Sequence, residues 1–188
     1  EERPDFHLSV RTGWMNDPNG FSYYNGQYHL FYQYNPYAPR WDSMHWGHAV
    51  TKDFLHWDYL PAALAPDEAY DRDGCFSGSA LTLPDGRQLL MYTGVLRERK
   101  ENGEHCDTQT QCLAVGDGVD YEKCAGNPVL DKNDIPEGSS VHDFRDPKMW
   151  QAEDGTYCCV VGNRPADGSG QILLYTSPDG FQWKFKSV

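Results

Sequence analysis

The chain lacks long hydrophobic runs and is poor in basic residues. No stretch approaches the roughly 18 consecutive apolar residues that a membrane-spanning helix needs, so we do not expect one. Its 16 Lys and Arg residues are outnumbered by 28 Asp and Glu residues, which gives a formal net charge of −12. Because binding to phosphate groups requires clustered Lys and Arg, neither nucleic acid nor an anionic membrane is expected as a partner. This charge favours a neutral small molecule as the ligand.

Zinc-binding and secretion signals are missing as well. The cysteine spacing contains no paired C-x-x-C motif; the residues are Cys75, Cys106, Cys112, Cys124, Cys158 and Cys159. A chain of this length with its own core does not depend on disulfides, and we predict a reducing compartment. The N-terminal Glu1-Glu2-Arg3-Pro4 has no apolar h-region and indicates a cytosolic start or the trimmed end of a mature chain. We predict a cytoplasmic protein, with secretion as the alternative.

Two motifs resemble metal sites, but each lacks an essential feature. His45 and His48 lie three residues apart, and on a strand this spacing points them to opposite faces. The segment Asp71-Arg72-Asp73-Gly74 begins like a calcium loop, yet no glutamate follows at the last loop position. We therefore predict a surface turn at this segment and no metal site.

A sustained 3.6-residue apolar period is also absent, so the pattern favours strands over helices. Three turn dipeptides each lead into an apolar, strand-like run, at Asn25-Gly26, Asp85-Gly86 and Asp154-Gly155. A second repeated element joins a Ser/Thr-x-Asp turn to an aromatic residue and a Trp, in 51–57 and again in 177–183. Self-similarity of this kind is typical of β-propeller blades, each made of four short strands.

The sequence therefore predicts an all-β propeller of about three blades. Closed propellers have roughly four to eight blades, and an unclosed array would leave apolar faces and strand edges exposed. We expect residues 1–188 to form the N-terminal portion of a longer propeller domain, or one piece of a split protein.

Two aspartates that each precede a proline are the main functional signal. Asp17 lies in Trp14-Met15-Asn16-Asp17-Pro18-Asn19-Gly20, and Asp146 lies in Phe144-Arg145-Asp146-Pro147. Proline restricts the preceding residue, so each carboxylate is presented from an extended or turning backbone. A pair of fixed carboxylates suits glycoside hydrolysis. The alternatives are an ordinary tight turn at Asp17 and a local ion pair on a surface turn at Arg145 and Asp146.

The sequence resembles glycoside hydrolase family 32, the invertases and fructan hydrolases. The resemblance rests on blocks that occur in family order, namely Trp14–Gly20, Phe31–Pro36, Trp46–His48, Phe76–Ser79 and Phe144–Pro147. It implies a five-bladed propeller, of which this chain supplies about the first three blades, followed in the family by a β-sandwich domain that is absent here. It also implies retaining hydrolysis of terminal β-fructofuranosides, such as sucrose, without a metal or cofactor.

The resemblance further implies roles for individual residues. Asp17 would be the nucleophile and Asp146 the transition-state stabiliser. The matching sugar-binding positions are Asn16, Gln33, Trp41, Trp46, Phe76, Ser77 and Arg145. We expect Arg145 to keep Asp146 ionised, because an adjacent guanidinium favours the charged carboxylate.

One expected catalytic group is missing. The family's acid/base is a glutamate in a Glu-Cys pair after the Arg-Asp-Pro block, and no glutamate here directly precedes a cysteine. We expect the acid/base to lie in a missing C-terminal part of the same protein, which would leave this chain nearly inactive. The alternative is a non-catalytic carbohydrate-binding propeller. The choice among sucrose, sucrose 6-phosphate, inulin and levan, and between hydrolysis and transfer to a second sugar, stays open.

Overall fold

The computed structural model describes residue 4 and residues 6–100 and 103–188. The N-terminal residues Glu1, Glu2 and Arg3, which we read as a cytosolic or trimmed start, lie outside this part. The described residues form strands and contain no helix, so none of them belongs to a helix that could cross a membrane. The strands are β1 (Trp14–Tyr24), β2 (Gln27–Asn35), β3 (His45–Thr51), β4 (Asp58–Leu64), β5 (Cys75–Thr82), β6 (Gln88–Arg99), β7 (His105–Gly116), β8 (Tyr121–Lys123), β9 (Ser139–Gln151), β10 (Tyr157–Pro165), β11 (Gln171–Ser177) and β12 (Lys184–Ser187).

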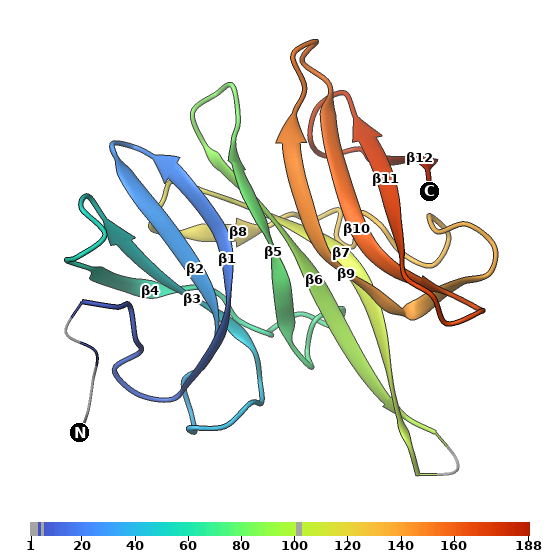
Figure 1. Cartoon of the computed structure of the whole chain (residues 1–188), viewed down its shortest axis with the longest axis horizontal. Coiled ribbons are helices and arrows are strands. Elements are labelled where there is room, and N and C mark those ends of the chain that lie inside the picture. The colour runs from blue at the N-terminus through green and yellow to red at the C-terminus, as the bar shows by residue number, and fades with distance from the viewer. Residues whose placement is uncertain (1–3, 5, 101–102) are drawn as a thin grey trace.

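These strands form three four-stranded antiparallel sheets in chain order, β1-β2-β3-β4, β5-β6-β7-β8 and β9-β10-β11-β12. The sheets fan out side by side, and the first strand of each one contacts the first strand of the next, β1 with β5 and β5 with β9 (Figure 1). We call β1, β5 and β9 the inner strands. The prediction of an all-β fold is confirmed, with three four-stranded sheets among the described residues, and the number of blades in the propeller stays a prediction.

The predicted hairpin turns connect the first two strands of every sheet. Asn25 and Gly26 join β1 to β2 with φ angles of 48° and 82°. Positive φ at both central residues matches the right-handed twist of the flanking strands. Gly86 and Gly155, each at φ 87°, lie in the equivalent turns of the other two sheets.

The second repeated element also forms the same structure twice, between β3 and β4 and between β11 and β12. The Thr51 hydroxyl accepts hydrogen bonds from the backbone N–H groups of Asp53 and Phe54. The Ser177 hydroxyl accepts from Asp179 and Gly180 in the same way. In both turns the aspartate carboxylate then accepts from the next two N–H groups. These side chains satisfy the backbone donors of the turn, which explains the recurring Ser/Thr-x-Asp pattern.

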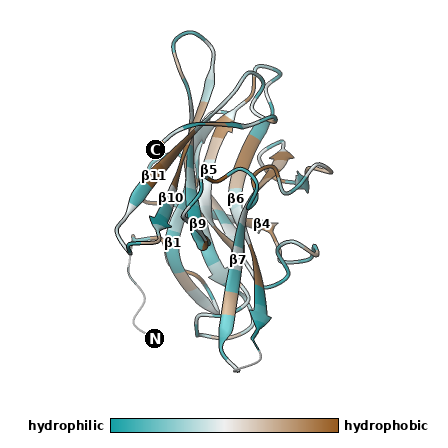
Figure 2. Ribbon diagram, turned by 90° about the vertical axis from the view of Figure 1, so that its right-hand side faces the viewer, coloured by the Kyte–Doolittle hydropathy of each residue, from teal (hydrophilic) through white to brown (hydrophobic). Residues whose placement is uncertain are grey.

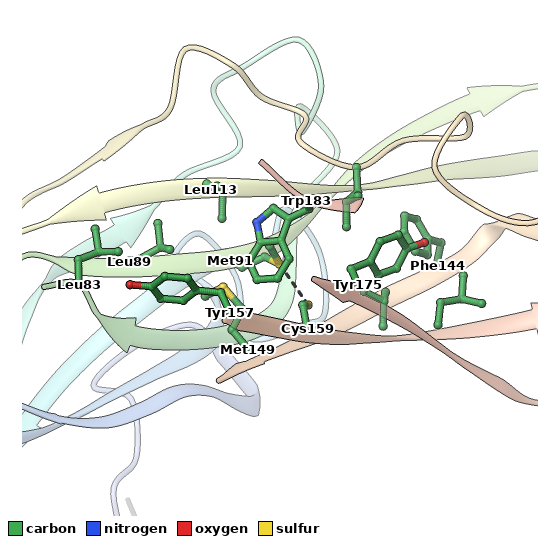
Figure 3. Packing of buried hydrophobic residues seen from close by; sticks show 13 residues of the cluster. Leu83, Leu89, Met91, Leu113, Phe144, Met149, Tyr157, Cys159, Tyr175 and Trp183 are labelled. Atoms are coloured by element: carbon green, nitrogen blue, oxygen red, sulfur yellow. Dashed lines mark hydrogen bonds between the residues drawn. The ribbon is translucent and has the colours of Figure 1, made fainter. Parts of the chain in front are cut away.

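The middle sheet is buried on both faces. Leu89 and Met91 of β6 pack into a core against the third sheet (Figure 3), whereas Leu90 and Tyr92 pack into a core against the first sheet. Successive side chains of a strand point to opposite faces, so an uninterrupted apolar run is what a central sheet requires. Hydrophobic stretches run along the strands and the connections are mostly hydrophilic (Figure 2).

The Asp71–Gly74 segment is a turn, but the prediction that it lies on the surface is wrong for Asp71, which is fully buried. Its carboxylate accepts from the Lys123 ammonium at 2.6 Å and from the Tyr92 hydroxyl at 2.7 Å. Lys123 also donates to the carbonyl of Ala65. Burial alone would lower the pKa of Lys123, but the surrounding anionic groups outweigh it and the pKa is raised. The ion pair therefore ties the β4–β5 connection to β8.

We expect Lys123→Met to lower the free energy of unfolding by about 3–5 kcal/mol, because it leaves the buried Asp71 carboxylate without its counter-charge. Urea unfolding measures this loss. Arg87→Met is the matched control, since it breaks an exposed ion pair with Asp85 and should leave stability nearly unchanged. Equal losses in the two variants would contradict a structural role for the buried pair.

Candidate active site

The inner strands each depart from regular pairing at a predicted site residue. The register of β1 against β2 shifts between Met15 and Pro18, which places Asp17 in the irregular stretch. The register of β5 shifts between Phe76 and Gly78, around Ser77, and that of β9 shifts where Asp146 lies. Bulges bend a strand and re-aim its side chains. The alternative of an ordinary tight turn at Asp17 is therefore wrong, because this segment is a bulged part of β1.

These irregular stretches meet in one open pocket of about 290 Å³. The Ser77 hydroxyl donates a hydrogen bond to the Asp17 carboxylate at 3.3 Å. Gly78 is required beside it, because a Cβ there would lie 1.9 Å from the Met91 carbonyl oxygen. The residues that line the pocket come from all three sheets and are Asp17, Pro18, Asn19, Ser77, Gly78, Asp146, Pro147 and Lys148.

The backbone of Asp146 adopts the left-handed conformation, with φ at 64°. This conformation is uncommon outside glycine, although aspartate tolerates it better than most residues. The Asp146 N–H donates to the Thr93 hydroxyl at 3.3 Å, and Thr93 in turn donates to Gln111 at 2.8 Å. Gln111 then donates to the Phe144 carbonyl at 2.7 Å. Buried polar side chains of the middle sheet thus hold the Asp146 segment in place.

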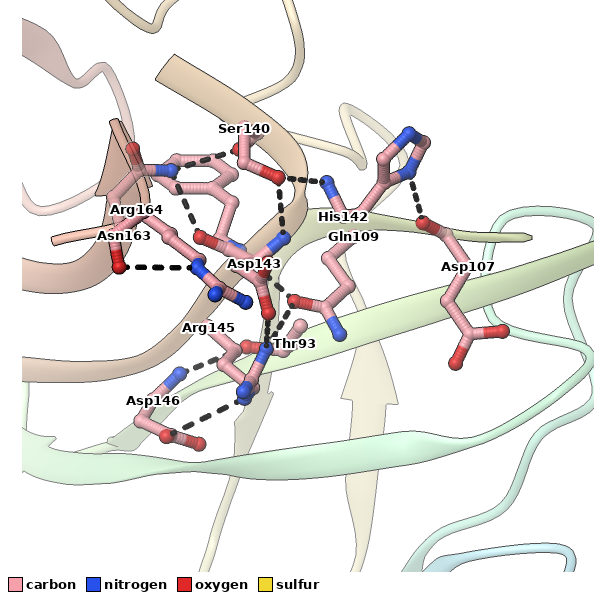
Figure 4. Close-up of polar contacts among 12 residues, drawn as sticks. Thr93, Asp107, Gln109, Ser140, His142, Asp143, Arg145, Asp146, Asn163 and Arg164 are labelled. Atoms are coloured by element: carbon pink, nitrogen blue, oxygen red, sulfur yellow. Dashed lines mark hydrogen bonds and ion pairs between the residues drawn. The ribbon is translucent and has the colours of Figure 1, made fainter. Parts of the chain in front are cut away.

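Arg145 is bound mainly to Asp143, not to its neighbour Asp146 (Figure 4). Its guanidinium lies 3.0 Å from the Asp143 carboxylate and 3.3 Å from the side-chain oxygen of Gln109. Its closest approach to the Asp146 carboxylate is 4.0 Å. Asp143 and Gln109 therefore hold the Arg145 guanidinium, and its distance from the Asp146 carboxylate is too long for a hydrogen bond.

The pKa of Asp146 is raised, chiefly by partial desolvation in the pocket. The charge of Arg145 lowers this pKa and the charge of Asp17 raises it, so the two aspartates lie close enough to interact. The Asp146 side chain keeps an exposed fraction of 61%, so the desolvation is partial. We expected Arg145 to decide the protonation of Asp146; its effect has the predicted sign but is smaller than that of burial.

Gln33 and Trp46, predicted to bind sugar, are buried behind β5. The Gln33 amide donates to the carbonyl of Cys75 at 2.9 Å, and the Trp46 indole N–H donates to that of Phe76 at 2.9 Å. In this structure both side chains support the strand that carries Ser77.

The remaining predicted residues lie nearer the surface. The side-chain oxygen of Asn16 accepts from the indole N–H of Trp14 at 2.9 Å. Trp41 is exposed, and its ring meets that of Phe76 edge to face at 5.8 Å. The Arg97 guanidinium lies 5.8 Å from the Trp41 ring.

Sequence reasoning missed several polar residues of the site. Lys148 and Asn19 line the pocket, and Asn19 is buried, with no hydrogen-bond partner for its amide among the described residues. Asn19 stands in the same motif as Asp17, which could have identified it; Thr93 and Gln111 have no such signal. The described residues contain no cluster of three or more His, Cys, Asp or Glu arranged for a metal.

The sequence model of the family "Glycosyl hydrolases family 32 N-terminal domain" matches residues 7–188. This chain belongs to family 32. It is 45% identical to the raffinose invertase of Escherichia coli and 44% identical to a sucrose-6-phosphate hydrolase of Zymomonas mobilis, over 98% and 97% of its length. The structure of a family 32 β-fructofuranosidase from Bombyx mori superimposes on 99% of the chain with a TM-score of 0.86 and 43% identity.

The chain spans little more than a third of the relatives it matches. It covers 37% of the Escherichia coli enzyme, 35% of the Zymomonas mobilis enzyme and 37% of the Bombyx mori chain. The family 32 membership therefore describes an N-terminal segment.

The pKa of Asp146 offers a test of the site electrostatics. We expect Asp17→Asn to lower this pKa, because it removes a nearby negative charge, and Arg145→Leu to raise it further, because it removes a positive one. A carbon-detected NMR titration of labelled aspartate measures both shifts. Asp85→Asn, on a remote hairpin, should leave the Asp146 titration unchanged. An unchanged curve for Asp17→Asn would show that the two carboxylates do not interact.

Proposed function

We propose that this chain is the nucleophile-bearing portion of a glycosidase that cleaves terminal non-reducing β-D-fructofuranosides by retaining double displacement. The substrates are sucrose or short fructo-oligosaccharides. The observation that carries the proposal is the pocket in which Asp17 of the first sheet faces Asp146 of the third. The family 32 match and a Bombyx mori relative whose variant was solved in complex with sucrose support a sugar substrate.

Asp17 is suited to act as the nucleophile. Its carboxylate receives one long hydrogen bond, from Ser77, within the described part of the chain. Lone pairs therefore remain available to attack the anomeric carbon of a bound fructosyl unit. Attack forms a covalent fructosyl–enzyme ester while the leaving oxygen departs, and water later cleaves that ester.

Asp146 stabilises the positive charge that develops in the transition state of each step. As the bond to the leaving group breaks, the fructosyl ring acquires oxocarbenium character, and a second fixed carboxylate lowers its energy. The network through Thr93 and Gln111 binds the backbone N–H of Asp146 and so supports the segment that carries this carboxylate. Arg145, with Asn16, Ser77 and the aromatic Trp41 and Phe76, would bind the sugar. Gln33 and Trp46 would contribute from behind β5.

The acid/base is the part that this pocket lacks. Protonation of the leaving oxygen requires a third group, and the pocket lining includes no glutamate. We propose that a C-terminal part, which the relatives possess, supplies this glutamate together with the blades that close the ring. The chain alone would then bind sugar without turning it over.

The non-catalytic carbohydrate-binding propeller is the second candidate. It shares the missing acid, but binding alone does not explain a second carboxylate, Asp17, close enough to raise the pKa of Asp146. A cytoplasmic location remains our proposal, with secretion as the alternative, since the relatives include a vacuolar enzyme of a Rosa hybrid.

The test is glucose release from sucrose by the chain alone and after joining it to the C-terminal part of the Escherichia coli raffinose invertase. We expect turnover only in the joined protein, and Asp17→Asn should lower its kcat on the order of 10³-fold or more. Asp85→Asn is the matched control and should retain full activity. Fructose binding by the chain alone is measured in parallel by calorimetry.

Turnover by the chain alone would refute the missing acid. Fructose binding without turnover in a correctly folded joined protein would favour the binding module instead.

A further inference from the structure

A thiol and an imidazole meet where the second sheet faces the third. The Cys106 sulfur on β7 lies 3.1 Å from Nδ1 and 3.2 Å from Nε2 of His142 on β9. Cys106 is half-buried and His142 is exposed, so solvent reaches the pair. Within the described part of the chain, Cys106 is the one cysteine in contact with an imidazole ring. The pair lies outside the pocket of Asp17 and Asp146, and the proposed glycosidase mechanism does not use it.

A backbone carbonyl determines which nitrogen of this imidazole carries the proton. Nδ1 of His142 lies 2.6 Å from the Asp107 carbonyl oxygen (Figure 4). A carbonyl can only accept, so Nδ1 carries the proton in the neutral ring and Nε2 keeps its lone pair. Nε2, 3.2 Å from the Cys106 sulfur, is therefore the ring nitrogen that is free to accept the thiol proton. Nucleophile, base and a third group that orients the base are the arrangement of an activated nucleophile.

The other cysteines are in environments that suppress reactivity or lack this partner. Cys75, Cys112 and Cys159 are fully buried, and burial raises the pKa of each thiol, that of Cys112 to about 12. Burial also raises the pKa of Cys124. Cys158 is half-buried on β10, opposite Trp150 and Thr176. Because the thiolate is the reacting form, Cys106 stands apart from all of them.

We propose that Cys106, activated by His142, is a covalent modification site that exchanges with small disulfides. The Cys106 thiolate attacks one sulfur of the disulfide, the S–S bond breaks, and a mixed disulfide forms on the protein. The departing thiolate takes the proton held by His142 and leaves as a thiol. The disulfide itself is the oxidant, and an added thiol reverses the reaction. A net charge of −12 favours uncharged or cationic disulfides as reactants.

The modification would take place close to the sugar-binding elements. His142 precedes Arg145 by three residues on β9, and the carboxylate of Asp107 pairs with Arg97 at 2.7 Å. Arg97 in turn lies against Trp41. A mixed disulfide on Cys106 would therefore displace the His142 side chain, which connects β9 to β7 at this edge of the sheets.

The test uses the native 188-residue chain and dithiodipyridine, an uncharged disulfide whose thiopyridone product absorbs light. Stopped-flow absorbance gives the rates, and peptide mass spectrometry locates the adducts. We expect Cys106 to react first, and Cys106→Ser to abolish the fast phase. His142→Gln should slow the modification of Cys106 about tenfold or more, because it removes the base. Cys158→Ser is the matched control and should leave the fast phase intact.

Buried Cys75 serves as an internal measure of folding in every variant, because it reacts only when the chain opens. If His142→Gln makes Cys75 reactive, His142→Asn replaces it. First modification at Cys158 or Cys124, or an unchanged Cys106 rate in a folded His142 variant, would overturn the proposal.

Discussion

Hydrogen bonds from buried side chains of one sheet to the backbone of the next inner strand hold the site together. Gln33 and Trp46 of the first sheet bind carbonyls of β5, and Gln111 of the second binds a carbonyl of β9. The Ser79 hydroxyl of β5 accepts from the N–H of Met149 on β9. A buried polar group left unpaired costs about 1–3 kcal/mol, so these bonds tolerate little displacement. They let β5 and β9 bulge at a site residue without losing their positions relative to their neighbours.

Groups with opposite effects determine the pKa of Asp146 in the pocket. Two carboxylates face each other in a chain that is already strongly acidic, and Arg145 is held mainly by Asp143. The raised pKa of Asp146 follows from this balance, because the charge of Arg145 only partly offsets the partial desolvation of the carboxylate and the charge of Asp17. Under the proposed function, the positive charge that develops on a sugar ring is what two neighbouring carboxylates would stabilise.

The contacts between sheets bring together functional side chains that no single sheet contains. Asp17 and Asp146 meet across three sheets, and Cys106 meets His142 across two. Within each sheet the same turns and hydrogen bonds recur, as Thr51–Phe54 and Ser177–Gly180 show. The repeated turns stabilise each sheet, and the proposed reactive groups lie where two sheets meet.

The sequence by itself determined the all-β class and the repeated turns, and it singled out Asp17 and Asp146, which the structure brings into one pocket. Asn25-Gly26 and the Ser/Thr-x-Asp elements act through local hydrogen bonds and φ preferences, which neighbouring residues determine. Only the tertiary structure decided that Asp17 lies in a strand bulge, that Asp71 is buried and that Arg145 turns to Asp143. The first two depend on partners distant in sequence, Tyr32 and Lys123, whereas Arg145 pairs with its near neighbour Asp143 and also contacts the distant Gln109. Burial and long-range pairing outweighed the local preference there, because a charge or backbone group removed from water takes whichever partner the packed sheets bring to it.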